Sequence, residues 1–167
     1  ARELLELHTV SSLRGYTETD IRESAKVLAG WGSNTDTLID KYYRQVKRNN
    51  PTVGSLNKFI YEPYFSHRAE PGSKKVLGKK IRSGKKGLKE LTKLLAHDDF
   101  TARHLSKKLA LHFIGEDVDK NEILSIYNVW KKSSGDLKEV HKKVLEVAAF
   151  STAKKFLWPS TWIFQAI

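Results

Sequence analysis

The residues with the strongest chemical signal are the cations between Pro71 and Lys89. This stretch, PGSKKVLGKKIRSGKKGLK, holds eight Lys or Arg residues and no Asp or Glu. Four glycines interrupt it, so a single solvated helix is disfavoured, and we expect a basic loop over residues 66–89 with exposed backbone amides. Such a loop can bind phosphate, carboxylate or an anionic polymer, and it can equally be a solvated surface that only keeps the protein soluble. The candidate anion-binding residues are Lys74, Lys75, Lys79, Lys80, Arg82, Lys85 and Lys86.

Three groups that could transfer protons lie near the N-terminus. Glu3 and Glu6 are three residues apart, so a helix would present both carboxylates together. His8 lies about 200° around the helix from Glu6, which is poor geometry for a metal site made by these residues alone. We therefore expect no metal and no cofactor.

Two interpretations of these groups remain open. In the first, the fold brings them beside Glu70 or His67, which would supply acid and base groups, with Lys74 holding an anionic substrate. In the second, Arg2 and the glutamates tie helices together through salt bridges, and His8 caps backbone carbonyl groups. The candidate catalytic residues are Glu3, Glu6, His8 and Glu70.

The composition describes a chain that can fold and that carries excess positive charge. Its 167 residues are 40% hydrophobic, which is enough for one core. Lys and Arg number 30 against 19 Asp and Glu, and the net charge of +11 favours nucleic acid, anionic lipid headgroups or acidic glycans as partners. The absence of cysteine excludes disulfides, thiolate nucleophiles and Cys-ligated zinc. No apolar run approaches the roughly 20 residues of a transmembrane span.

The spacing of apolar residues predicts a mostly α-helical chain. We expect a single compact bundle of about seven or eight helices with no substantial sheet, forming one domain over residues 1–167. Thr17 and Asp20 fit the N-terminal capping pattern of one helix, and Asp98 or Asp99 fits that of another. Residues 59–65 could form a short extended segment. The expected helices are one whose last turns hold residues 4–8, one from the Thr17 cap to Gly30, one over 34–48, a short one around 88–95, one from the Asp98 or Asp99 cap to Phe113, one around 123–130 that ends by Gly135, one from Asp136 through Ala148, and a terminal one that starts at Pro159.

The first residues, ARELLELH, open inside a helical pattern without a methionine or a capping residue. We therefore expect an N-terminal region of the same protein upstream of Ala1.

Six segments, in this order, resemble the bacterial domain of unknown function 1800 family. They are ARELLELHT, GYTETDI, LAGWG, AEPGSKKVLG, TARHLSKKLALHF and SGDL, and the resemblance runs from Ala1 to about Ile167. It is to the C-terminal part of the family, whose members typically carry a helical region upstream and often look exported. The resemblance therefore implies a place in the cell envelope, and it implies architecture more than activity.

The resemblance also singles out residues that support a site. One position departs from the family pattern: where the family often has His followed by an acid, this chain has Ala69 and Glu70, with His67 two positions before Ala69. If the family histidine is a ligand or a base, its role here is lost or has moved to His67. The matching positions are Arg2, Tyr16, Asp20, Trp31, Gly72, Gly78, Arg103, Lys108 and His112.

Together these observations predict a non-catalytic helical module that binds an anionic ligand or polymer. The alternative is a hydrolase-like enzyme that acts on an anionic substrate through Glu and His acid–base groups. A second alternative is nucleic-acid binding, in which the rings of Tyr61, Tyr64 and Phe65, just ahead of the lysines, stack on bases.

Overall fold

A computed structural model of the chain describes residues 1–32 and 64–155. In these residues it contains six α-helices, two short 3-10 helices and one two-stranded antiparallel sheet, which confirms the prediction of a mostly helical chain with little sheet. The predicted helices at 34–48 and 159–166, and most of the extended segment at 59–65, lie outside the described residues. The total of seven or eight helices and the single domain stay predictions.

Contacts within the chain form two compact units. One unit holds Ala1 and residues 16–92, and the other holds residues 2–15 and 93–167. Each unit is described by itself.

The first helix of unit 1 is α2 (Glu18–Leu28), and it begins as the sequence predicted. The Thr17 hydroxyl accepts a hydrogen bond from the Asp20 backbone N–H at 3.2 Å, and the Asp20 carboxylate accepts one from the Thr17 N–H at 2.9 Å. This reciprocal pair is a capping box, which satisfies two of the N–H groups that a helix start leaves without partners. On the inward side of α2, Ser24 and Val27 are buried.

The basic stretch forms a β-hairpin, so the prediction of a loop over residues 66–89 is wrong. After a short 3-10 helix, η2 (Ser66–Arg68), strands β1 (Lys74–Val76) and β2 (Lys79–Ile81) pair antiparallel. The two residues between them, Leu77 and Gly78, have φ angles of 49° and 77°. Two successive positive φ angles define a type I′ turn, whose twist matches that of a hairpin. Val76 and Ile81 are buried, and this apolar side pins the strands in register.

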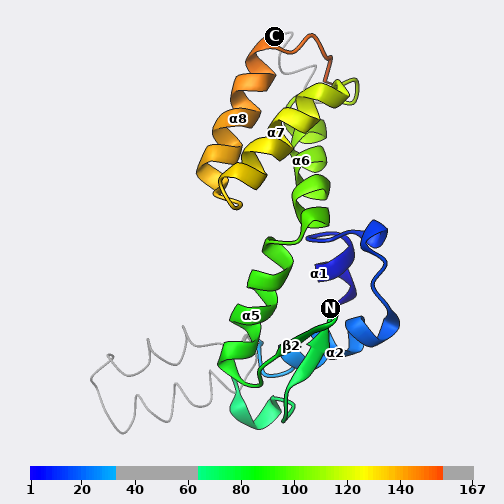
Figure 1. The fold of residues 1–167 in the computed structure, drawn as a ribbon, viewed down its shortest axis with the longest axis vertical. Helices are drawn as coiled ribbons and strands as arrows, with labels where there is room; N and C mark the ends of the chain where they lie inside the picture. The colour runs from blue at the N-terminus through cyan, green and yellow to red at the C-terminus, as the bar shows by residue number, and fades with distance from the viewer. Residues whose placement is uncertain (33–63, 156–167) are drawn as a thin grey trace, which may run out of the picture. The chain divides into compact units, whose positions relative to one another are not determined.

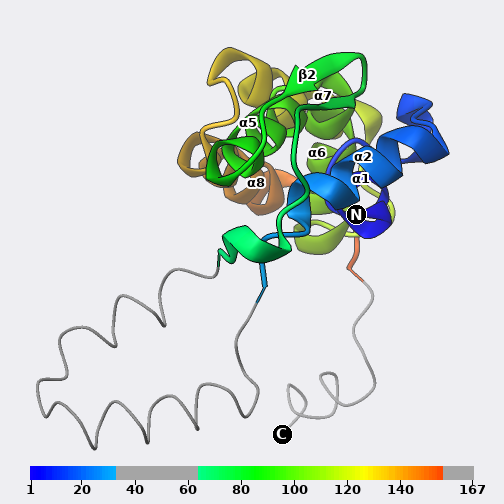
Figure 2. The ribbon, with the colours of Figure 1, turned by 90° about the horizontal axis from the view of Figure 1, so that it is seen from below.

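The helix α5 (Lys85–Ala96) follows the hairpin after a short turn. Its residues 85–92 belong to unit 1 and its residues 93–96 to unit 2. Gly87 lets the first turn of α5 approach the hairpin, because a Cβ there would lie 2.3 Å from the Arg82 carbonyl oxygen. The hairpin is thus flanked by α2 and by the first turns of α5 (Figures 1 and 2).

An isolated antiparallel bridge between Trp31 and Tyr64 completes the described part of unit 1. The two rings pack with their centroids 5.1 Å apart. Gly30 makes room for this contact, because a Cβ at that position would lie 2.7 Å from the Tyr64 ring.

Unit 2 is built on three long helices, α6 (Asp99–Phe113), α7 (Lys120–Lys132) and α8 (Leu137–Phe150), which pack side by side (Figure 1). The N-terminal residues of the chain add α1 (Arg2–Glu6) and the 3-10 helix η1 (Ser12–Arg14). Asp98, Asp119 and Asp136 cap the three long helices through hydrogen bonds from backbone N–H groups. The core of the three helices consists of Ala102, Ala110, Ile114, Ile126, Trp130, Val140 and Val144.

Among residues 1–32 and 64–155, no helix has the length and apolar character needed to cross a membrane.

Candidate anion-binding site

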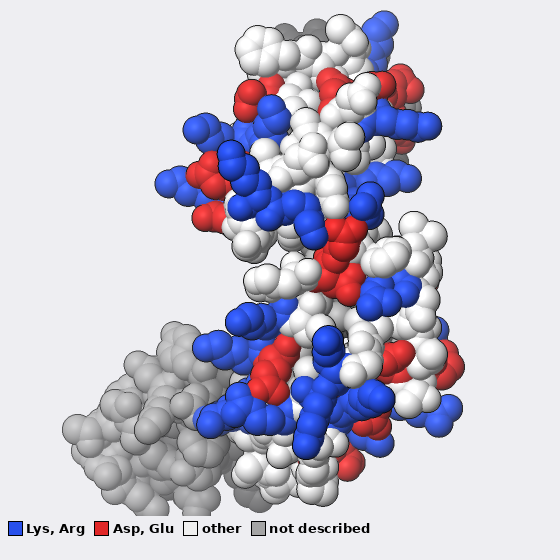
Figure 3. All heavy atoms as spheres, in the orientation of Figure 1, with Lys and Arg blue, Asp and Glu red and all other residues white. Residues whose placement is uncertain are grey.

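The seven basic residues singled out from the sequence fall on the hairpin and the start of α5. Figure 3 shows Lys and Arg side chains gathered over this part of the chain, with a few carboxylates between them. Six of the seven side chains are exposed, and Lys74 is buried. The exposed residues are Lys75, Lys79, Lys80, Arg82, Lys85 and Lys86.

Lys75 and Lys80 form the central feature of this surface. They are directly opposite each other in the register of the hairpin, and both are exposed. Residues opposite each other in antiparallel strands have their Cβ atoms about 5 Å apart, and like charges at this spacing repel. Within the described residues, no hydrogen bond or ion pair engages the ammonium groups of Lys75, Lys79 or Lys80. Lys79 pairs with Val76 and so lies on the other side of the hairpin. The repulsion between Lys75 and Lys80 is not relieved by an ion pair of their own, although the Glu23 carboxylate accepts a hydrogen bond from the Lys75 backbone N–H at 3.4 Å, and an anion placed between the two ammonium groups would relieve it further.

Glu23 and Glu90, two of the carboxylates near the hairpin, are already occupied. A hydrogen bond from Lys26 lowers the pKa of the Glu23 carboxyl, which lies 2.6 Å from the Lys26 Nζ. Arg82 donates to Glu90 through its backbone N–H at 2.7 Å and through its guanidinium, and both bonds lower the pKa of Glu90. The Arg82 guanidinium thus has a resident partner, whereas the ammonium groups of Lys75 and Lys80 do not.

Lys74, predicted to bind an anion, instead holds the backbone of the preceding turn. Its side chain is 4% exposed, and its ammonium donates to the carbonyl oxygens of Glu70 at 2.5 Å, Gly72 at 2.7 Å and Pro71 at 3.0 Å. An ammonium has three N–H donors, so these bonds use all of them. Lys74 therefore closes the turn that precedes β1, in which Gly72 has a φ of 74°, and it has no donor left for an anion in this conformation.

The hairpin turn is anchored to α2 by Asp20. One carboxylate oxygen of Asp20 accepts from Thr17 in the capping box, and the other accepts a hydrogen bond of 2.7 Å from the Leu77 backbone N–H. Asp20 thus joins the start of α2 to a turn 57 residues away and fixes how the hairpin sits on α2.

The first turn of α5 adds positive charge beside the hairpin. It carries Lys85 and Lys86 and no acidic residue, although a helix N-terminus favours negative charge. The Lys85 ammonium lies 5.8 Å from the centre of the Tyr64 ring, within range of a cation–π interaction. The exposed pair of the hairpin and this turn together define the basic face, which consists of Lys75, Lys80, Lys85 and Lys86.

A family model described as "Protein of unknown function (DUF1800)" matches residues 1–167, the whole chain. The chain belongs to the DUF1800 family. No curated protein and no solved structure matches it. The resemblance seen in the sequence is therefore confirmed, and it leaves the activity of this DUF1800 chain to be argued from its own residues.

The candidate catalytic residues of this DUF1800 chain are divided between the two units. Glu3, Glu6 and His8 belong to unit 2, whereas Glu70 belongs to unit 1 with His67. The side chains of Glu3, Glu6 and His8 make no hydrogen bond or ion pair within the described residues. Residues 1–32 and 64–155 contain no group of three His, Asp or Glu side chains that could hold a metal ion. Their acid–base role stays a prediction.

Of the residues singled out by the resemblance, Lys108 and its neighbour His104 have a clear contact. The Lys108 ammonium donates to the Leu7 carbonyl oxygen at 2.9 Å, and His104 Nε2 lies 3.2 Å from the same oxygen. These side chains hold the chain at the end of α1, where a cation is favourable. His112 is exposed and packs its ring edge-on against Phe113, with centroids 4.8 Å apart.

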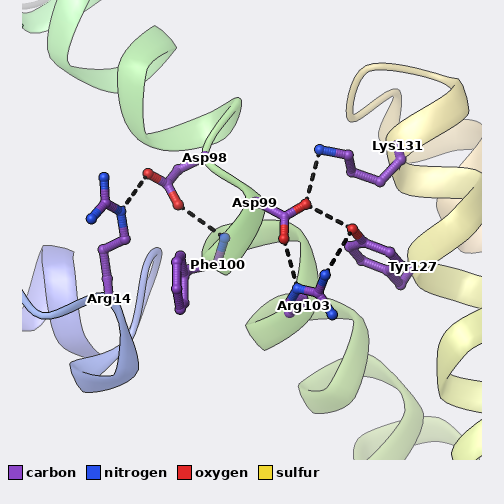
Figure 4. Close-up of polar contacts among 7 residues, drawn as sticks. All are labelled: Arg14, Asp98, Asp99, Phe100, Arg103, Tyr127 and Lys131. Atoms are coloured by element: carbon purple, nitrogen blue, oxygen red, sulfur yellow. Dashed lines mark hydrogen bonds and ion pairs between the residues drawn. The ribbon is translucent and has the colours of Figure 1, made fainter.

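A polar cluster in unit 2 was missed by the sequence analysis, although it includes Arg103 (Figure 4). Asp99 accepts hydrogen bonds from the Tyr127 hydroxyl at 2.7 Å and from Arg103 Nε at 2.6 Å, and it pairs with the Lys131 ammonium at 2.9 Å. The bond from Tyr127, followed by those from Lys131 and Arg103, holds the pKa of Asp99 well below its ordinary value. The same contacts raise the pKa values of Arg103, Tyr127 and Lys131.

The neighbouring Asp98 is satisfied independently. It accepts from the Phe100 backbone N–H at 2.9 Å as the cap of α6, and from Arg14 Nε at 2.9 Å (Figure 4). A sequence signal for the Asp99 cluster exists, since Asp99 and Arg103, and likewise Tyr127 and Lys131, are four residues apart and share one face of their helices. Sequence spacing alone does not tell that the two faces meet.

Proposed function

We propose that this chain is a non-catalytic module that binds a linear polyanion on its basic face. The observation that carries the proposal is the exposed pair of Lys75 and Lys80, which are opposite each other and lack carboxylate partners. Two ammonium groups at this spacing are favourable for an oxygen-rich anion, and the lysines in the first turn of α5 extend the charge beyond a single anionic group.

The chemistry of the face favours recognition by charge over recognition of shape. Lysine presents a hydrated point charge and lacks the planar fork with which arginine reads a carboxylate or a phosphate. The Arg82 guanidinium is paired with Glu90. Exposed, mobile ammonium groups bind weakly one at a time and gain affinity when several contact one polymer.

Base stacking receives less support. Tyr64, one of the rings expected to stack, packs against Trp31 and Gly30. Phe65 lies against His67 and under the guanidinium of Arg68. Because the family resemblance implies export, anionic polymers of the cell envelope are the first ligands to test, with nucleic acid as the comparison.

The test is a binding titration at two salt concentrations. The chain is titrated with labelled heparin, long-chain polyphosphate, single-stranded DNA, RNA and anionic liposomes, beside the double variant Lys75→Gln/Lys80→Gln. The matched control is Lys138→Gln/Lys142→Gln, which removes two exposed charges from α8. We expect salt-dependent binding of a polymer that the hairpin variant weakens and the control retains.

The salt dependence gives a number to check. Each phosphate contact contributes about 0.7 to 0.9 to the slope of log K against log salt, so loss of two contacts should reduce the slope by about 1.5. Equal binding by the hairpin variant and the α8 control would show that net charge alone is responsible. Absence of binding to every polymer would overturn the proposal.

A further inference from the structure

Unit 2 contains a pocket that none of the sequence motifs pointed to. It has a volume of about 150 Å³ and lies where the end of α5, the start of α6 and the end of α7 meet. A cavity of about this volume can admit a six-membered ring. The lining residues are Ala96, His97, Asp98, Ala102, Trp130, Lys131 and Ser134.

One wall of the pocket is apolar and rigid. Trp130 is 6% exposed and Ala102 is 1% exposed, and both belong to the core of unit 2. Gly135 lies against the Trp130 ring, since a Cβ there would be 3.2 Å from the indole nitrogen. This wall can hold the carbon skeleton of a small molecule without rearranging.

Two other lining residues, Ser134 and Lys131, offer hydrogen-bond donors that the fold does not use. The Ser134 hydroxyl makes no hydrogen bond within the described residues. His97 donates from Nδ1 to the Lys93 carbonyl oxygen at 2.9 Å, so Nε2 of the neutral ring is an acceptor and offers no donor to an anion. The Lys131 ammonium donates one of its three N–H groups to Asp99, so two N–H groups remain for a ligand.

The resident charges leave one cation in excess at the pocket. Asp98 is matched by Arg14, whereas Asp99 is shared by the two cations Arg103 and Lys131 (Figure 4). If Lys131 turned toward a ligand, Asp99 would still be held by Arg103 and by the Tyr127 hydroxyl. Lys131 can therefore exchange its partner without leaving Asp99 unpaired.

We propose that this pocket binds a small organic oxyanion, a carboxylate or a phosphate monoester. Lys131 is the charge partner, Ser134 donates a hydrogen bond at the rim of the pocket, and Trp130 packs against the carbon skeleton. Asp98 lines the pocket with both of its oxygens already bonded, and its charge disfavours a second negative charge on the ligand, so a carboxylate is favoured over the dianion of a phosphate monoester.

Nuclear magnetic resonance of the full chain tests this site. The amide signal of Ser134 and the indole N–H signal of Trp130 are followed during titration with acetate, benzoate, phenyl phosphate and inorganic phosphate. Sodium chloride at equal ionic strength is the reference. We expect saturable shifts of these two signals with at least one organic anion and none with chloride.

Two variants and a matched control decide the role of the named groups. Lys131→Gln should weaken binding at least tenfold, and Lys132→Gln, which removes the next and exposed ammonium of α7, should leave it unchanged. Ser134→Gly removes the hydroxyl at a residue whose φ is 55°, where glycine is unstrained, and should weaken binding while leaving the fold intact.

The outcomes separate this site from the polyanion surface. Lys75→Gln/Lys80→Gln should bind the small anion as the parent chain does. Absence of a saturable shift with every anion, or unchanged binding by both Lys131→Gln and Ser134→Gly, would overturn the proposal.

Discussion

Replacing Asp20 by alanine tests whether one carboxylate holds the hairpin on α2. The replacement removes the capping-box acceptor for Thr17 and the acceptor for the Leu77 backbone N–H. The Thr17 cap itself remains, because its hydroxyl still accepts from the backbone N–H of residue 20, and loss of the reciprocal hydrogen bond from the Thr17 N–H costs about 1 kcal/mol of folding free energy. A hydrogen bond from a partly buried amide to a charged acceptor contributes about 1.5 to 3 kcal/mol. We therefore expect Asp20→Ala to lower the free energy of unfolding by about 3 kcal/mol.

Urea unfolding followed by circular dichroism measures this loss, and hydrogen exchange of the Leu77 amide shows where it occurs. Asp20→Asn keeps the size of the side chain but only one acceptor oxygen, so it should lose roughly half as much stability. Thr19→Ala, an exposed change in the same helical turn, is the control and should stay within about 0.5 kcal/mol of the parent chain. If Asp20→Ala behaves like Thr19→Ala and the exchange rate of Leu77 is unchanged, the proposed anchoring is refuted.

Three further predictions concern single residues. Lys74→Met should destabilise the chain by about 2 to 4 kcal/mol in urea unfolding, because it leaves three carbonyl groups without their shared donor; a loss below 0.5 kcal/mol would contradict the role assigned to Lys74. Leu77→Asn should raise the unfolding free energy by about 0.5 to 1 kcal/mol, since asparagine tolerates the positive φ of a type I′ turn better than leucine does. Asp99→Asn should lower the free energy of unfolding by about 1 kcal/mol at pH 7. The loss is small because the Asp99 side chain is 37% exposed and solvent screens its ion pairs. The pKa of Asp99 is lower in the folded chain, so this contribution is present above the ordinary value of 3.8 and is lost as the pH falls below it; thermal unfolding from pH 7 to pH 2 should show parent and variant converging at the acid end.

The sequence predicted the helices well where caps and apolar spacing agree. Thr17 with Asp20 and Asp98 before Phe100 mark helix starts that the structure confirms. These signals are local, because a cap and the first turn it serves lie within four residues of each other.

The hairpin was not predicted because its sequence lacks the usual signals of a strand and of a type I′ turn. Its buried residues, Val76 and Ile81, stand among lysines, and the turn uses Leu77 before Gly78 where Asn or Asp would have signalled a type I′ turn. The Leu77 N–H is bonded to Asp20, and the local sequence does not reveal a partner that is 57 residues away.

The arrangement of the charged residues could not be predicted either, because it depends on contacts between distant parts of the chain. The positive charge of residues 71–89 was visible in the sequence, but not that Lys74 is buried while Lys75 and Lys80 face each other across two strands. The Asp99 cluster depends on the packing of α6 against α7, which spacing within each helix does not specify.

The burial of Lys74 gives the chain a built-in chemical reporter. Amine-reactive reagents acylate an exposed, deprotonated lysine, and an ammonium enclosed by three carbonyl groups is shielded from them until the surrounding turn opens. Lys75, adjacent in sequence and exposed, would react at the rate of an ordinary surface amine. The ratio of modification at these two neighbouring residues, read by mass spectrometry, would therefore report how often the turn before β1 opens, without any label or mutation in the protein.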